Sequence, residues 1–173
     1  DCTGFGGMAG SNALCGMGQL GVDLTQLVVA PTVAYQFSPG HSVGFSPLLV
    51  YQQFSAYGLQ MFQMTPGAST DAAHLTNNGH DDSTGIGMRL GYMGKLSDTV
   101  SVGASYSPKI NMSRFKDYAG LFAGQGDFDI PENYGLGVAF QATPSVQLLA
   151  DNNHIAYSKV ASIGNPAGFN MGA

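Results

Sequence analysis

The sequence has few charged residues, no tryptophan and no long run of apolar residues. Of its 173 residues only 10% are charged while 44% are hydrophobic, whereas soluble domains usually carry about 25% charged residues. This scarcity of charge argues against a well-solvated globular surface. The hydrophobic fraction argues equally against a disordered chain, which has low mean hydropathy.

Basic residues are especially scarce, with 6 Lys and Arg against 11 Asp and Glu and a net charge of −5. A nucleic-acid partner would require a basic face, so this class is excluded. The longest apolar stretches, such as residues 27–30 and 48–50, are far shorter than the roughly 18 residues of a membrane-spanning helix. A chain too apolar for water and too finely interrupted for such helices is typical of an all-β fold, an antiparallel transmembrane β-barrel of the outer-membrane type.

Cysteine is also rare, and the two that occur, Cys2 and Cys15, bracket a glycine-rich segment. In an oxidising periplasmic or surface setting they can pair as a loop-closing disulfide. The alternative is two free thiols.

What the sequence does contain is apolar and small residues alternating with a period of two, which predicts strands. The clearest strand sets Ile86, Met88 and Leu90 against Gly87 and Arg89 on the opposite face. The second predicted strand exceeds the 9 to 11 residues that cross a bilayer, so its later part is expected to project beyond the membrane. Six strands are predicted, at residues 24–37, 42–60, 84–96, 99–111, 133–142 and 146–159.

Cations indicate which face is which. Arg89 and Lys109 fall on the small polar face of their predicted strands, and a cation facing lipid near the midplane costs about 2–4 kcal/mol. The polar face is therefore predicted to line the lumen. A soluble β-sandwich also alternates, but its polar face would carry many charges, whereas this one is mostly Gly, Ser, Ala and Gln.

Short and long connections alternate along the chain. Outer-membrane barrels have short periplasmic turns and long extracellular loops, so the tight turns at 38–41, 97–98 and 143–145 predict the periplasmic side. The predicted organisation is a glycine-rich extracellular segment at 1–20, six strands within 21–160 with extracellular loops at 61–83 and 112–132, and the start of a further extracellular loop at 161–173.

Several segments carry a resemblance to a known family. They are GVDLTQLVVAPTVAY (21–35), YQQFSAYGLQ (51–60), STGIGMRLG (83–91), KDYAGLFAGQGDFDIPE (116–132) and YSKVASIGNP (157–166). Together they resemble the FadL-type outer-membrane transporters, which also include uptake channels for toluene-like aromatics. The resemblance implies a barrel of about 14 strands with an N-terminal hatch, and passive uptake of long-chain fatty acids or similar hydrophobic compounds across the outer membrane of a Gram-negative bacterium.

Six strands make only part of such a barrel. An open sheet exposes two edges, and unpaired backbone groups in lipid cost several kcal/mol each, so the remainder of the barrel must come from a longer chain or from other chains. An alternative function follows from the same edges, a structural or adhesive surface β-protein that assembles through them. What pairs with the edge strands distinguishes the two.

Apolar residues at the starts of the loops are the candidates for substrate capture, because Met and aromatic side chains suit a promiscuous apolar site. The alternative is that they pack the two loops against each other. A carboxylate substrate would also need a buried cation, for which Arg89 and Lys109 are the candidates unless Arg89 pairs with a lumenal carboxylate. The capture candidates are Phe54, Tyr57, Leu59, Met61, Phe62 and Met64 in the first loop, and Phe115, Tyr118, Leu121 and Phe122 in the second.

No motif for metal, cofactor or catalysis stands out. The run from His80 to Asp82 lacks the spacing of a zinc or EF-hand site, and the four histidines form no recognisable set with a nucleophile. The sequence therefore predicts a protein that is not an enzyme and uses no cofactor, and whose partners are hydrophobic small molecules, outer-membrane lipid and the remainder of the barrel.

Overall fold

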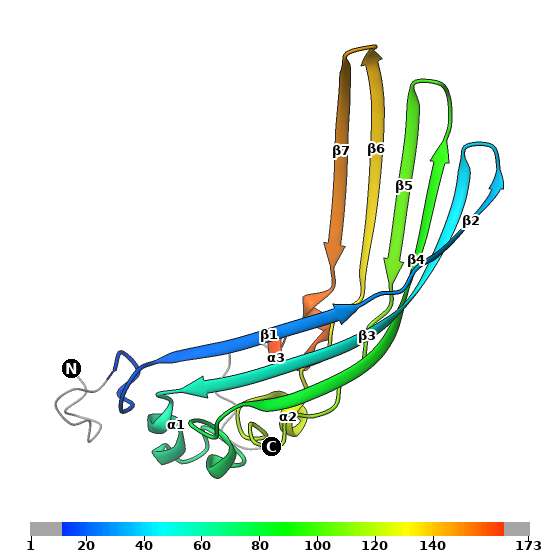
Figure 1. Cartoon of the computed structure of the whole chain (residues 1–173). Coiled ribbons are helices and arrows are strands. Elements are labelled where there is room, and N and C mark those ends of the chain that lie inside the picture. Colours follow the sequence, from blue (N-terminus) through cyan, green and yellow to red (C-terminus); the bar gives the residue numbers. More distant parts are fainter. Residues whose placement is uncertain (1–11, 165–173) are drawn as a thin grey trace.

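A computed structural model describes residues 12–164. Their strands form one antiparallel sheet (Figure 1). Neighbouring strands follow the order β1-β3-β4-β5-β6-β7, and β2 also pairs with β3. The predicted all-β antiparallel fold is confirmed, as an open section of barrel wall. The strands are β1 (Gly21–Val29), β2 (Val33–Ser38), β3 (His41–Tyr57), β4 (Asp81–Lys95), β5 (Val100–Ser107), β6 (Asn133–Thr143) and β7 (Val146–Ile155).

Short helical turns lie only at the end opposite the tight β2–β3, β4–β5 and β6–β7 turns (Figure 1). Among the described residues no helix has the length and apolar character needed to cross a membrane. The helical turns are α1 (Gln60–Met64), η2 (Ala72–His74), α2 (Ala123–Gly126), η3 (Tyr157–Lys159) and α3 (Ala161–Gly164).

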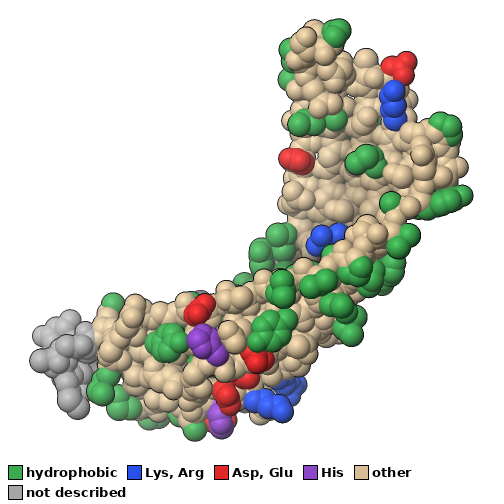
Figure 2. Space-filling view, viewed as in Figure 1, with side chains coloured by type: hydrophobic (Ala, Val, Ile, Leu, Met, Phe, Trp, Pro, Cys, Tyr) green, Lys and Arg blue, Asp and Glu red, His purple; other side chains and the backbone are tan. Residues whose placement is uncertain are grey.

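The strand register gives the sheet two different faces. Phe45 pairs with Leu90, and Tyr106 with both Leu90 and Tyr134, on an outer face whose apolar side chains are exposed. Figure 2 shows such hydrophobic side chains along the strands, with charged groups gathered mainly near the loops. On the inner face Gly103 pairs with Gly137, and the inner positions of β4, β5 and β6 are mostly Gly and Ser. The inner positions of β3 also include Leu48 and Val50. The predicted alternation therefore separates an apolar outer surface from an inner one that is made of small residues along β4 to β6.

The predicted strand 24–37 is wrong in one respect, because the structure divides it into β1 and β2. The β1 ladder ends where Val29 pairs with Leu49, and the β2 ladder begins where Val33 pairs with Phe45. The register does not change between them, so Pro31 stands opposite Pro47. Neither proline has an N–H to donate, and the ladder is interrupted there.

The hydroxyls of Thr32 and Ser46 bridge this interruption, with their Oγ atoms 2.8 Å apart. Thr32 also donates to the carbonyl of Ala30 at 3.1 Å. Side-chain hydrogen bonds thus replace the missing backbone ones.

The fourth predicted strand also ends early. β5 stops at Ser107 instead of Asn111, directly before Pro108, which cannot continue a central ladder. β5 pairs with β4 only along residues 90–95, so the first part of β4, residues 81–89, has no pairing with β5. The segment 108–132 lies beside this part of β4 and contacts it through the bridge Gly85↔Met112. The sheet accordingly opens into two arms with this segment between them (Figure 1).

Two apolar clusters hold the 108–132 segment against the inner face. The first joins Leu48 and Val50 of β3 to Ile110 and Met112, with Ile130 packed beside them. The close approach depends on glycine in β4, since a Cβ at Gly87 would lie 2.5 Å from the Cγ1 of Ile110. The second cluster is built from the aromatic residues described below.

Candidate functional site

The aromatic residues predicted to capture substrate form the second apolar cluster. Phe54 of β3 lies with its ring centroid 4.9 Å from that of Tyr118, 4.8 Å from that of Phe122 and 5.7 Å from that of Phe115. Phe115 and Tyr118 are fully buried. Leu59 and Leu121, two further candidates, pack on the same cluster. These residues join the two loops to each other and to β3.

Tyr118 also fixes the polar backbone next to this cluster. Its hydroxyl accepts a hydrogen bond from the N–H of Ala56 at 3.1 Å and donates to the carbonyl of Gly79 at 2.5 Å. Burial raises the pKa of the Tyr118 hydroxyl. The side chain therefore connects the end of β3, the first loop and the second loop.

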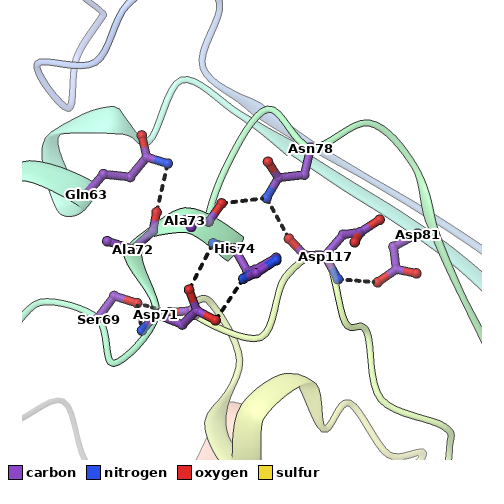
Figure 3. A network of polar contacts seen from close by, with 10 residues as sticks. Gln63, Ser69, Asp71, Ala72, Ala73, His74, Asn78, Asp81 and Asp117 are labelled. Atoms are coloured by element: carbon purple, nitrogen blue, oxygen red, sulfur yellow. Dashed lines mark hydrogen bonds and ion pairs between the residues drawn. The ribbon is translucent and has the colours of Figure 1, made fainter.

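A polar network reinforces the contact between the loops (Figure 3). Asn78 donates through its side-chain amide to the carbonyl of Asp117 at 2.6 Å, and the Ser69 hydroxyl donates to the carbonyl of Gly120 at 2.7 Å. The Asp71 carboxylate holds the His74 ring nitrogen Nδ1 at 2.7 Å. The His74 hydrogen bond keeps the pKa of Asp71 below its ordinary value.

The methionine part of the candidate set has a different environment. Met61, Phe62 and Met64 line an apolar cavity of about 680 Å³ together with Leu14 and Pro66. Met64 is 68% exposed, so this cavity opens to the surface. Within the described residues, these three side chains are the sequence candidates that the structure places at an accessible apolar site.

Tyr57 differs from both groups. It lies at the end of β3 and is partly exposed, and its hydroxyl accepts a hydrogen bond from Ser55 at 2.9 Å. The structure does not bring it into the methionine-lined cavity.

The two candidate cations are not equivalent. Arg89 lies on the inner face opposite Ser46 and is exposed, and within residues 12–164 no carboxylate forms an ion pair with it. Lys109 was predicted to face the lumen from a strand, but this is wrong because β5 ends before Pro108. The Nζ of Lys109 lies 2.7 Å from Oδ2 of Asp129, so the positive charge of Lys109 is paired with this carboxylate.

A second cavity lies on the inner face, which sequence reasoning did not find. Its volume is about 290 Å³, and β1, β3, the segment before β6 and the residues after β7 all contribute to its walls. Strand phase places Gln26 and Gln52 on this face, but only the register makes them opposite neighbours. The apolar walls are Leu24, Phe128, Ile130, Pro131, Ile155, Tyr157 and Ile163.

The remaining sequence candidates concern the disulfide and metal binding. Cys15 is disulfide-bonded, while Cys2, its predicted partner, lies outside the described residues. In the described part of the chain, no three His, Cys, Asp or Glu side chains are placed to hold a metal ion. His80 instead contacts Asp23 of β1, with Nε2 3.4 Å from Oδ2.

Comparison with solved structures identifies proteins of the same fold. The toluene transporter TbuX of Ralstonia pickettii matches with a TM-score of 0.60 and 18% identity over 82% of this chain. The toluene transporter TodX of Pseudomonas putida matches with a TM-score of 0.57 and 19% identity over 80% of it. The monoaromatic hydrocarbon channel CymD matches with a TM-score of 0.55 and 18% identity over 82% of it.

The chain has the fold of these channels. It spans less than half of their length, between 43% and 48%, which agrees with the open sheet. No model of a protein family and no curated protein sequence matches it. At the level of the fold, the resemblance to the FadL-type transporters is confirmed.

Proposed function

We propose that this chain forms part of an outer-membrane channel through which small hydrophobic compounds pass passively in a Gram-negative bacterium. The observation that carries the proposal is the pairing of an exposed apolar outer face with an inner face that is lined by glycine and serine along β4 to β6. A lipid-facing and a lumen-facing set alternate in this way in transmembrane barrels. The likeness to channels named for toluene and monoaromatic hydrocarbons supports the same function.

Capture is proposed to occur at the cavity lined by Met61, Phe62 and Met64. Flexible methionine side chains adapt to ligands of different shape, and the open apolar surface removes a solute from water. The aromatic cluster around Phe54 holds the loops in place. The process is downhill and requires no cofactor or catalytic group.

The test is uptake of radiolabelled toluene by vesicles that contain the protein extracted in its native membrane form. The double variant Met61→Gln, Met64→Gln replaces two apolar walls by polar ones, and each kcal/mol of lost contact slows capture about fivefold. The matched control is Leu96→Gln, which changes an exposed apolar residue near the β4–β5 turn. Unchanged uptake in the double variant would exclude this cavity as the capture site.

A second measurement separates fatty acids from hydrocarbons. Arg89 is the inner-face cation without a carboxylate partner among the described residues, and a hydrogen bond to a charged group contributes about 1.5–3 kcal/mol. If long-chain fatty acids are substrates, Arg89→Gln slows their uptake about tenfold or more while toluene uptake is unchanged. If Arg89→Gln leaves the uptake of both compounds at the rates of the parent protein, Arg89 does not bind the carboxylate.

A further inference from the structure

Two separate parts of the chain form the walls of the methionine-lined cavity. One wall consists of α1 and the residues that follow it, and the other belongs to the segment 12–18, which lies beside α1 (Figure 1). Ala13, Leu14 and Cys15 are the residues of this segment that line the cavity. Leu14 is 40% exposed and Met17 is 61% exposed, so burial of large apolar side chains does not hold the segment in place. Its position depends on hydrogen bonds.

Gln60 provides two of these hydrogen bonds. Its Oε1 accepts the backbone N–H of Met17 at 2.9 Å, and its Nε2 donates to the carbonyl of Met17 at 3.3 Å. One side chain therefore binds both backbone groups of Met17, as a residue of a neighbouring strand would. Gln60 is also the first residue of α1, directly before Met61 of the opposite wall. The same short helix thus carries one wall of the cavity and holds the other.

Asn12 and two glycines attach the segment independently of Gln60. The Nδ2 of Asn12 donates to the carbonyl of Gly58 at 2.8 Å, while its Oδ1 accepts the N–H groups of Leu14 at 3.0 Å and Gly16 at 3.1 Å. A Cβ at Gly16 would overlap the carbonyl oxygen of Gly58, so the two backbones are in direct contact there. Loss of the Gln60 side chain should therefore displace the Leu14 wall without detaching the segment.

The size and charge of the cavity indicate its ligand. Its volume is about 680 Å³, whereas an apolar cavity of about 150 Å³ already accommodates benzene. A single ring therefore fills only a fraction of this volume, while a longer molecule can contact both walls. No Lys, Arg, Asp or Glu is among the described residues that line the cavity, and burial of an unpaired charge is costly. Both features favour a neutral ligand larger than one ring.

We propose that this cavity selects neutral hydrocarbons of two rings or of similar length, held between Leu14 and the methionines of α1, and that Gln60 positions the Leu14 wall. The inference rests on the proposed function and deepens it, because it names a substrate class and a positioning residue for the same cavity. The selection is by contact area, since the hydrophobic effect is proportional to the apolar area removed from water.

Uptake of radiolabelled biphenyl and toluene by vesicles that contain the native membrane form tests the proposal. Initial rates over a range of concentrations, corrected for vesicles without protein, give a half-saturating concentration and a maximal rate for each compound. Gln60→Leu is expected to raise the half-saturating concentration of biphenyl about tenfold, which corresponds to about 1.4 kcal/mol. The value for toluene and both maximal rates should stay close to those of the parent protein.

Three further variants separate positioning from contact. Leu14→Gln removes the apolar contact itself and should raise the biphenyl value as Gln60→Leu does. Gln60→Glu keeps the acceptor for the N–H of Met17 but loses the donor, so its effect should be intermediate. Gln63→Leu is the matched control, because it makes the same change in the same helix and Gln63 donates instead to the carbonyl of Ala72 at 2.9 Å. It should behave as the parent protein does.

Other outcomes would overturn this inference. A lower maximal rate for both compounds in the Gln60 variants, with unchanged half-saturating concentrations, would mean that Gln60 serves only the fold of the loop. Equal sensitivity of biphenyl and toluene to Gln60→Leu, or no effect of Leu14→Gln, would exclude selection by the two walls. Each of these results leaves the proposed function standing if the parent protein takes up toluene. Failure of the parent protein to take up either compound would overturn both.

Discussion

At the scale of single residues, the loops are held by groups whose roles no periodic pattern reveals. The Asp71 carboxylate accepts hydrogen bonds from both the backbone N–H of His74 at 3.3 Å and its ring nitrogen at 2.7 Å. Gly120, from the other loop, donates its N–H to the carbonyl of His74 at 2.7 Å. The short turn η2 is thus held on both sides, and one carboxylate contributes to its order (Figure 3).

This arrangement predicts an acid-sensitive loop. The pKa of Asp71 is lowered by the His74 hydrogen bond, so the carboxylate stabilises the folded loop above its unfolded pKa of about 3.9. The stabilisation is lost as the pH falls through the lower folded value. Limited proteolysis of residues 65–80 should therefore accelerate below about pH 4.

Asp71→Asn is expected to accelerate cleavage near neutral pH and to weaken its pH dependence. Asp98→Asn is the matched control, because Asp98 forms an exposed ion pair at the β4–β5 turn. If loop cleavage in the Asp71 variant keeps the same pH profile as in the parent protein, the carboxylate has no part in ordering the loop.

At the scale of elements, alternation predicted the strands and their faces but not their interruptions. The predicted strands 84–96 and 133–142 correspond to β4 (Asp81–Lys95) and β6 (Asn133–Thr143). The agreement is close because apolar and small residues alternate regularly between the two faces along both strands. Pro31 and Pro108 do not disturb the apolar pattern, yet they remove backbone donors. Alternation is a property of side chains, so it does not indicate the division of the first strand or the early end of β5.

The glycines of β4 give an element-scale prediction. Gly87→Val places a Cβ 2.5 Å from Cγ1 of Ile110, and overpacking of this kind costs roughly 1–3 kcal/mol. The 108–132 segment should lift from the sheet, lowering the unfolding temperature and exposing the segment to protease. Gly103→Val is the control, because the atom nearest to its Cβ would be 3.9 Å away. Equal stability of the two variants would contradict the packing described for this segment.

The candidate site was only partly predictable for a related reason. Composition identified the apolar loop residues, but it could not divide them into the buried cluster around Phe54 and the open cavity at Met61 and Met64, since that division depends on how two distant loops meet. The phase of the alternation alone is enough to place Gln26 and Gln52 on the inner face. Their hydrogen bond and the cavity beside them depend on register and on residues 128–163, which no local pattern relates.

At the scale of the whole molecule, the sheet has two edges, formed by β1 and β2 at one side and by β7 at the other (Figure 1). In lipid their free backbone groups must be paired. We expect the outward N–H groups of β7 to exchange with deuterium as slowly as those of β4 in the native membrane form. Rapid exchange along β7 would contradict a closed wall.

What pairs with β7 separates the channel from the adhesive alternative. Cross-linking of single cysteine substitutions along β7, followed by mass spectrometry of the linked peptides, identifies the neighbouring strand. Links to further strands of one barrel support the channel. Links between copies of this same segment would support assembly through open edges.

The facing prolines have a mechanical consequence for the wall. Between the β1–β3 and β2–β3 ladders, the contact between the strands at Pro31 and Pro47 depends on one pair of hydroxyls, those of Thr32 and Ser46, in place of backbone hydrogen bonds. The β1–β2 edge can change direction at this line without breaking a ladder bond to β3, whereas the β3–β4 ladder runs past Pro47 uninterrupted. We expect an edge that bends at this line to adjust to bilayers of different hydrophobic thickness, a mismatch that otherwise costs fractions of a kcal/mol per Å.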